Sequence, residues 1–184
     1  MTRPAVVLVG APGAGKSTVG RLLAGSLNVP FRDTDADIEA QAGTSISDIF
    51  LEQGEEHFRA LERQAVAAAL AECAGVVALG GGAVLAEQTR RLLAGHTVAW
   101  LDVELPAAAK RVGLARDRPV LLGNPRSQLL RLLEERRPLY ADVATLRVTT
   151  DDRAAADVAA EIAAVLGAPN DSAASTPDSE ERHG

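Results

Sequence analysis

Aromatic residues, cysteines and long apolar runs are scarce in this chain of 184 residues. Aromatics make up only 3% of the residues, so the core must be built mostly from Ala, Val, Leu and Ile. The single cysteine, Cys73, excludes an intrachain disulfide and fits a reduced, cytoplasmic setting. A buried apolar role is expected for it, with a reactive thiol as the alternative. No apolar run approaches the ~20 residues of a membrane helix, and residues 1–4 lead straight into a predicted strand without a signal-peptide core. We therefore expect a cytoplasmic protein with no membrane partner.

Net charge is −6, and the residues after Gly167 carry half of it. That segment, 168–184, is rich in Ser, Asp, Glu and Pro, so a disordered polar tail is expected. The net charge of −6 argues against a nucleic-acid-binding protein, although the half of it that remains on the body says little about partners. Hydrophobic residues reach 47%, and the length suits one domain, predicted to span 1–167.

A glycine-rich stretch, Gly10-Ala-Pro-Gly-Ala-Gly-Lys-Ser-Thr18, lies between an apolar run and a helix-like segment. It matches the Walker A pattern G-x-x-x-x-G-K-[ST], in which backbone N–H groups cradle phosphates. Glycines let the backbone curl close to the anion, and the following helix directs its positive end toward it. Lys16 is expected to reach the β- and γ-phosphates, and the Ser17 hydroxyl to bind Mg²⁺. A chance glycine turn is the alternative, and the loop alone does not choose a substrate.

Strands and helices alternate along the rest of the chain. Alternation predicts an α/β fold with a parallel sheet and helices on both faces. Five strands are expected, near 5–9, 31–34, 76–79, 97–103 and 146–150. The helices are expected at about 16–27, 36–42, 45–50, 55–73, 86–94, 106–112, 128–136 and 154–166, with Gly54 interrupting and Pro138 ending or kinking its helix. The segment 113–125, rich in Arg, Gly and Pro, is expected to be a loop or mobile flap.

Two polar or glycine-rich stretches follow predicted strands, at the sheet edge where ligands gather. In Asp33-Thr34-Asp35, strand alternation would place both acids on one face, one for the Mg²⁺ shell and one for a substrate hydroxyl. The alternative is that one acid caps the next helix. Gly80-Gly81-Gly82 implies close approach of the backbone to another group, with a plain tight turn as the alternative.

Three arginines, Arg59, Arg118 and Arg136, are candidates for binding carboxylate or phosphate, since guanidinium groups hold both in a bidentate way. Each alone could equally be a surface residue. Glu62 follows Arg59 by three residues, so the two can pair on one helix face. The pair either orients Arg59 or is an ordinary solvated ion pair.

Taken together, these motifs resemble the shikimate kinases, particularly the actinobacterial type with Ala-rich helices and a polar tail. The resemblance covers about residues 5–166 and preserves the order and spacing of six motifs. They are the phosphate loop, Asp33-Thr34-Asp35, Phe58-Arg59-x-x-Glu62, Gly80-Gly81-Gly82, Arg118-Pro119 and Arg136-x-Pro138-Leu139-Tyr140.

The resemblance implies a P-loop fold like that of the nucleoside monophosphate kinases, with strand order 2-3-1-4-5 and a monomeric protein. It also implies transfer of the γ-phosphoryl group of ATP to the 3-hydroxyl of shikimate, with Mg²⁺. The substrate-binding helices would lie at about 33–62 and a mobile lid at about 113–125.

Site residues follow from the same resemblance. Lys16, Asp35 and Arg118 would be catalytic, with Asp35 engaging ring hydroxyls as a possible base and Arg118 descending from the lid. Asp33 would reach Mg²⁺ beside Ser17. Shikimate would contact Asp35, Phe50, Phe58, Arg59, Gly80, Gly81, Gly82 and Arg136. ATP would contact Gly13, Ala14, Gly15, Lys16, Ser17, Thr18, Arg111, Arg118 and Arg153, although the segment 150–155 lacks the Asn-Arg-x-Pro form of some members.

Two other functions compete with this interpretation. Another small-molecule kinase of the same fold, such as gluconate kinase, would explain the phosphate loop but not the combined acid, glycine and arginine motifs. A catalytically silent nucleotide-binding module need not keep Lys16, Ser17, Asp33, Asp35 and Arg118 together.

Overall fold

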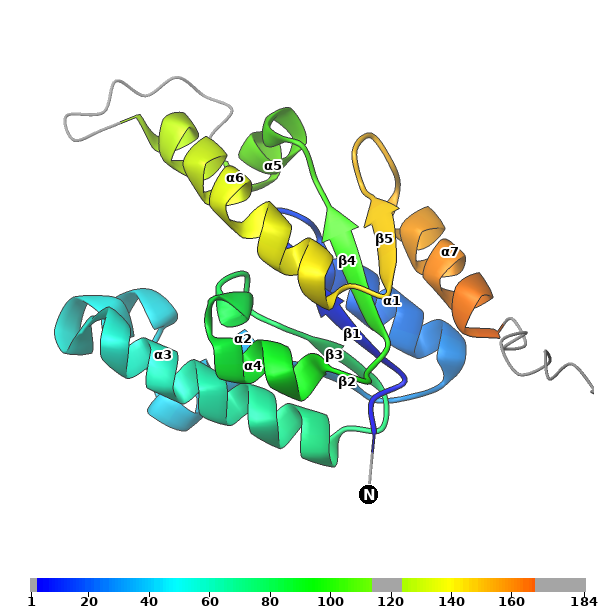
Figure 1. Ribbon diagram of the computed structural model, residues 1–184, viewed down its shortest axis with the longest axis horizontal. Coiled ribbons are helices and arrows are strands. Elements are labelled where there is room, and N and C mark those ends of the chain that lie inside the picture. Colours follow the sequence, from blue (N-terminus) through cyan, green and yellow to red (C-terminus); the bar gives the residue numbers. More distant parts are fainter. Residues whose placement is uncertain (1–2, 114–123, 168–184) are drawn as a thin grey trace, which may run out of the picture.

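A five-stranded parallel sheet forms the centre of the computed structural model, which describes residues 3–113 and 124–167 (Figure 1). The order is β2-β3-β1-β4-β5, and every neighbouring pair is parallel. The strands are β1 (Val6–Val9), β2 (Phe31–Asp33), β3 (Val76–Ala78), β4 (Val98–Asp102) and β5 (Leu146–Thr149). The predicted parallel sheet and strand order are thus confirmed.

Helices cover both faces of this sheet. On one face α1 packs against α7, and on the other lie α3, α4 and α6 (Figure 1). The bounds are α1 (Lys16–Leu27), α2 (Thr34–Ala42), α3 (Ile46–Glu72), α4 (Glu87–Leu93), α5 (Leu105–Arg111), α6 (Pro125–Val143) and α7 (Ala155–Gly167), with a short 3₁₀ helix, η1 (Ala83–Leu85). The sequence does not predict η1, because three residues are too few for a periodic pattern.

The main core is aliphatic, as the scarcity of aromatics predicts. All residues of β1, β3 and β4 are buried, as expected for strands covered on both faces. Each fully buried Val or Leu there contributes about 1.5–3 kcal/mol through burial of its apolar surface. Cys73 is a free, buried thiol, in line with its expected apolar role.

A second, smaller apolar cluster lies under α2 and the first half of α3. Its buried members are Ile38, Ile49, Phe58 and Ala65. Gly54 interrupts α3 with a backbone conformation outside the helical region (φ 83°, ψ 168°), as predicted. Ser45 caps the start of α3, and its hydroxyl accepts from the Asp48 N–H at 3.1 Å.

Of the two expectations for Pro138, an end or a kink of its helix, the end is wrong, because α6 continues through Pro138 to Val143. Proline removes one backbone hydrogen bond and crowds the preceding turn. Here the helix is held on both sides of Pro138 by Leu133 and Tyr140, which are 3% and 1% exposed. Tertiary packing outweighs the local penalty. The helix also begins earlier than expected, at Pro125, because the Asn124 side chain caps it.

The prediction that strand alternation places Asp33 and Asp35 on one face is also wrong, because the two residues do not belong to one strand. Strand β2 ends at Asp33, and α2 begins at Thr34, so Asp35 belongs to a helix. The Asp33 carboxylate accepts from the Asp35 N–H at 3.0 Å and so starts the helix. The chain turns before the alternation can continue.

Across the described ranges, 3–113 and 124–167, none of the helices combines the length and apolar character needed to cross a membrane.

Candidate active site

The phosphate loop joins β1 to α1 at the carboxyl edge of the sheet. Gly13 and Gly15 have φ of 79° and 91°, in the left-handed region that favours glycine. A side chain at Gly13 would also come within 2.9 Å of the Ala108 carbonyl oxygen. With Gly15 at its N-cap, α1 directs its free N–H groups at the loop, an arrangement suited to phosphate.

Lys16 lies across this loop. Its ammonium group donates to the carbonyl oxygens of Gly10 at 2.7 Å and Ala11 at 3.1 Å. Desolvation lowers the pKa of Lys16 to about 8, while Asp35 and Asp33 oppose that shift. A bound phosphate would favour the charged form further, so Lys16 meets an anion as a cation at neutral pH.

The two acids line one cavity with the phosphate loop. This cavity has a volume of about 380 Å³ and includes Gly13, Gly15, Lys16, Ser17, Thr18, Asp33, Asp35 and Arg111 in its lining. The Ser17 hydroxyl donates to the Asp33 carboxylate at 2.5 Å. Asp33 therefore caps α2 and faces the cavity at once, so the two alternatives for it do not exclude each other.

Asp35 has fewer hydrogen bonds to its carboxylate than Asp33 has among the described residues. Its Oδ1 is buried, and within the described part of the chain it has no hydrogen-bond partner. Burial and repulsion from Asp33 raise the pKa of Asp35 to about 6, against the opposing attraction of Lys16. A carboxylate with a free, buried acceptor oxygen and a pKa near neutrality is suited to accept a proton.

The three glycines after β3 approach side chains of the site, as predicted. An added Cβ at Gly80 would collide with the Asp35 carboxylate, and one at Gly82 would collide with the Arg59 guanidinium. At Gly81 it would lie 2.9 Å from the Pro12 ring in the phosphate loop. The run brings Asp35, Arg59 and the phosphate loop together, so it is more than a plain turn.

Arg59 is oriented by acids on its own helix. It donates to Glu62 at 2.7 Å, and to Glu55 at 3.2 Å. Glu62 is only 3% exposed, so the alternative of an ordinary solvated pair is wrong. Its carboxylate holds the guanidinium in one place with further N–H groups to offer.

Phe58 and Phe50 lie beside Arg59. Their ring centroids are 4.6 Å apart, and the Arg59 guanidinium is 5.3 Å from the Phe58 ring centre. Phe58 belongs to the small apolar cluster, whereas Phe50 is only partly buried and keeps surface for a ligand.

A second cavity of about 240 Å³ adjoins the phosphate loop on the side of α7. Arg111, Thr150 and Arg153 line it, together with Gly15 and Thr18 of the loop. The Arg111 guanidinium donates to the carbonyl oxygens of Gly13 at 3.1 Å and Thr150 at 2.5 Å. Arg153 pairs with Glu161 at 2.7 Å. The two arginines therefore line a second hollow beside the phosphate loop and are both anchored by contacts within the protein.

Arg136 lies on α6. Desolvation lowers the pKa of Lys16 and raises that of Tyr140, and the positive charge of Arg136 acts on both groups, adding to the first shift and opposing the second. Arg118 and most of the expected lid, as well as the expected disordered tail, lie outside the described residues.

Sequence reasoning assigned no role to two hydroxyls that reach the glycine run. Thr34 is fully buried, and its Oγ1 accepts from the Gly80 N–H at 3.2 Å. The Tyr140 hydroxyl donates to the Gly81 carbonyl oxygen at 2.6 Å. The only signals were the position of Thr34 between two acids and the status of Tyr140 as the single tyrosine.

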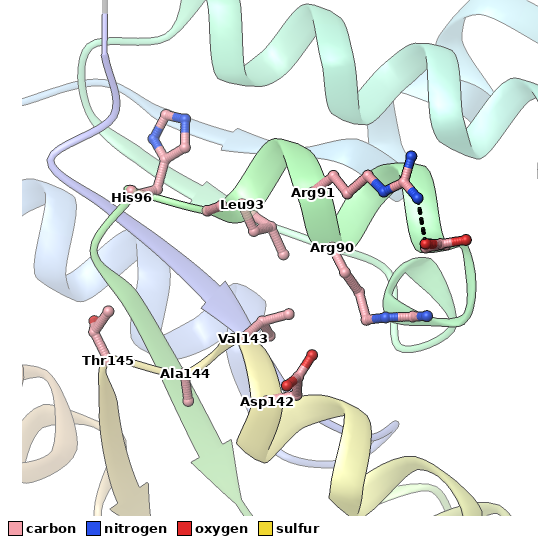
Figure 2. A pocket seen from close by; sticks show the side chains of 11 residues that line it. Arg90, Arg91, Leu93, His96, Asp142, Val143, Ala144 and Thr145 are labelled. Carbon is pink, nitrogen blue, oxygen red and sulfur yellow. Dashed lines mark hydrogen bonds and ion pairs between the residues drawn. The ribbon is translucent and has the colours of Figure 1, made fainter.

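A larger cavity, of about 560 Å³, lies elsewhere, between α4 and the end of α6 (Figure 2). It is at the amino end of β4 and β5, away from the phosphate loop. Its arginines are engaged within the protein, Arg91 with Glu87 at 2.5 Å and Arg90 with the Val84 carbonyl at 2.6 Å. Size alone therefore does not identify the active site.

The fold and this site define a P-loop phosphotransferase. Comparison with known proteins identifies the acceptor class. The chain matches the shikimate kinase family over residues 12–167 and belongs to that family. It is accordingly an ATP-dependent shikimate kinase.

Individual proteins and structures similar to this chain are also shikimate kinases. The chain is 62% identical over 165 residues to a shikimate kinase of Salinispora arenicola, covering 90% of this chain and 99% of that protein. It is 59% identical over 170 residues to one of Thermobifida fusca, covering 92% and 99%. Among solved structures, shikimate kinase from Acinetobacter baumannii in complex with shikimate shares 36% identity with a TM-score of 0.82, covering 90% of this chain and 93% of that one.

Proposed function

We propose that this chain transfers the γ-phosphoryl group of ATP to the 3-hydroxyl of shikimate in the cavity between the phosphate loop and α2. The observation that carries this is the position of Asp35, which lines the same cavity as Lys16 and has a buried oxygen without a hydrogen-bond partner among residues 3–113 and 124–167. An acceptor hydroxyl bound to Asp35 would face a phosphoryl group bound to the loop, as in-line transfer requires.

On the acceptor side, Asp35 accepts a hydrogen bond from the shikimate hydroxyl and takes its proton as the O–P bond forms. Its raised pKa of about 6 makes the carboxylate a stronger base while leaving it mostly ionised at neutral pH. Glu62 contributes indirectly, because it fixes Arg59.

The shikimate carboxylate binds to Arg59 and Arg136, which converge on the acceptor side from α3 and α6. Guanidinium forks match a carboxylate in charge and geometry. Phe50 and Phe58 pack against the ring, and the backbone of Gly80, Gly81 and Gly82 completes the pocket. The close contact between Gly82 and Arg59 supports this assignment.

On the donor side, backbone N–H groups of Gly13, Ala14 and Gly15 bind the phosphates, together with Lys16, Ser17 and Thr18. Arg111 and Arg153 flank the adenine in the second cavity. Lys16 neutralises charge that develops on the transferring group. We also assign Arg118 to this role.

The oxygen donors at Ser17 and Asp33 fit Mg²⁺, a hard cation that binds few protein groups and keeps substrate phosphates and waters as its other ligands. Among the described residues no group of three His, Cys, Asp or Glu side chains could form a dedicated metal cage, which agrees with a metal that arrives with the nucleotide. When bound, Mg²⁺ neutralises phosphate charge.

The first experiment is release of ADP by the purified protein from Mg-ATP, with and without shikimate. We expect strong stimulation by shikimate and none by gluconate. ADP release at the same rate with and without shikimate would contradict the acceptor assignment. No ADP release from a folded, ATP-binding protein would favour a catalytically silent nucleotide-binding module. A gluconokinase structure from Sinorhizobium meliloti, 21% identical with a TM-score of 0.51, shares the fold alone.

Replacement of Arg59 should weaken shikimate far more than ATP. We expect Arg59→Ala to raise the KM for shikimate by about 10- to 140-fold, because a charge-assisted contact of about 1.5–3 kcal/mol is lost. The KM for ATP should change less than about twofold, since ATP binds at the other end of the cavity. Steady-state kinetics with each substrate varied in turn measure both.

Two controls accompany that variant. Arg63→Ala removes an arginine of the same helix that lines neither cavity, and it should leave both KM values unchanged. Arg59→Lys keeps a charge near buried Glu62 but loses the planar fork, so it separates recognition from the destabilisation that an unpaired Glu62 brings. Equal losses for shikimate and ATP would indicate a folding defect instead.

We further propose that the domain of 1–167 acts as a monomer in the cytoplasm, without nucleic-acid or membrane partners. Cys73 is a free, buried thiol, which supports a reducing compartment.

A further inference from the structure

A run of three glycines is a flexible support for a binding site. Glycine adopts many backbone conformations, so Gly80-Gly81-Gly82 would sample several arrangements unless other groups held it. Two side-chain hydroxyls do so from different elements. Thr34 at the start of α2 accepts from the Gly80 N–H at 3.2 Å, and Tyr140 of α6 donates to the Gly81 carbonyl at 2.6 Å.

The hydrogen bond from Tyr140 fixes one peptide plane. The Gly81 carbonyl and the Gly82 N–H belong to the same trans peptide unit, so they point in opposite directions. With the carbonyl turned to Tyr140, the N–H turns away from α6. Within residues 3–113 and 124–167, no backbone carbonyl accepts from the Gly82 N–H.

Gly82 also lies directly against the group that defines the acceptor pocket. An added Cβ at this position would collide with the Arg59 guanidinium. Gly82 and the Arg59 guanidinium are therefore in direct contact, so the orientation of the Gly81–Gly82 peptide decides which backbone groups lie next to Arg59.

We infer that Tyr140 is a positioning residue for the acceptor site, whose hydroxyl fixes the orientation of the Gly81–Gly82 peptide against Arg59 and thereby sets the affinity for shikimate. This inference rests on the proposed function. Burial raises the pKa of Tyr140 to about 12, so its hydroxyl keeps the donated proton throughout the working pH range.

The same helix carries Arg136, four residues before Tyr140 and hence on the same face. Tyr140 thereby connects α6, which carries Arg136, to the glycine run, which contacts Arg59. Its ring is held independently, with its centroid 6.1 Å from that of Trp100, which in turn lies 4.7 Å from the Arg147 guanidinium. Removal of the hydroxyl alone should leave this packing in place.

The test is Tyr140→Phe, studied after the wild-type protein has shown shikimate-stimulated ADP release. We expect the KM for shikimate to rise about tenfold with kcat and the KM for ATP within about twofold, because the carboxylate is remote from the reacting hydroxyl and its binding is uniform. Thr34→Val, which removes the other hydroxyl, should also raise the KM for shikimate alone. If the wild-type protein shows no stimulation, the proposed function fails first.

Trp100→Phe is the matched control, since it disturbs the packing of the Tyr140 ring but keeps the hydroxyl bond. It should lower Tm without changing the KM for shikimate. The reverse pattern, in which Tyr140→Phe lowers Tm and leaves that KM within about twofold, would overturn the inference and leave a structural role.

Backbone NMR of the wild-type protein tests whether the peptide that Tyr140 holds responds to shikimate, and it does not depend on the folding of Tyr140→Phe. With ¹⁵N-labelled glycine, the Gly82 amide signal should shift saturably as shikimate is added. A Gly82 signal that stays in place at saturating shikimate would overturn the proposal.

Discussion

Asp35→Asn should reduce kcat by about 10²–10⁴-fold, the usual contribution of a positioned general base. Asparagine keeps the shape and one acceptor oxygen, but it cannot take the hydroxyl proton. The KM values for ATP and shikimate should change less than kcat, because the variant removes an interaction that strengthens as the proton moves. Quenched-flow or steady-state measurement of ADP formation gives the rate.

The pH dependence of the wild-type enzyme gives an independent check on Asp35. Its pKa is raised to about 6 by burial and by Asp33, so the active carboxylate form is lost as pH falls below that value. The acidic limb of the rate profile should therefore lie near pH 6, and it should be absent from the residual activity of Asp35→Asn. An unchanged acidic limb in the variant would assign the limb to another group.

Asp35→Asn should raise the stability of the folded protein although it lowers the activity. A carboxyl whose pKa is raised in the folded state is more costly to ionise there than in the unfolded chain, so its destabilising effect is present above pH 6 and fades below it. Asp35→Asn should then raise the Tm at pH 8 by a few degrees, corresponding to about 1–2 kcal/mol, and by less at pH 5. Differential scanning fluorimetry at both pH values measures the contrast.

Lys16→Met should be comparably damaging. Methionine matches the length of the side chain but removes the charge directed at the transferring phosphoryl group. Loss of one such stabilising group typically lowers kcat by about 10²–10³-fold. Unlike Asp35→Asn, this variant should also weaken ATP, because the charge contacts the phosphates in the ground state as well. Nucleotide titration and kinetics together separate the two effects.

The chain contains one other lysine, Lys110, which is exposed on α5 and serves as a matched control. Lys110→Met makes the same chemical change on the surface and should leave kcat and ATP affinity unchanged. A similar loss in both variants would mean that net charge, rather than the position of Lys16, controls the reaction.

Local signatures explain what the sequence could predict. The phosphate loop has its glycines, lysine and serine within nine consecutive residues, so its role and its place after β1 follow directly. The parallel sheet follows from the alternation of strands and helices. Arg59 and Glu62 share a helix turn, so their pairing could be expected, although only the fold shows that Glu62 is buried.

The sequence could not predict hydrogen bonds between elements that are far apart in the chain. Thr34 and Gly80 are 46 residues apart, and Tyr140 and Gly81 are 59 apart, so no local pattern pairs them. At Asp35, a single side-chain cap turned the chain from strand to helix earlier than periodicity indicated. At Pro138, buried neighbours on both sides outweighed a local helix-breaking signal.

The separate apolar cluster under α2 and α3 has a consequence for local stability. Ile38, Ile49, Phe58 and Ala65 pack with one another rather than in the main core, and Gly54 divides the helix that carries most of them. The segment of α2 and α3, which we propose binds the acceptor, should thus open as a cooperative unit at a lower free energy than global unfolding requires. Its amides should exchange with solvent sooner than those of β1 and β3, and a bound acceptor should slow that exchange.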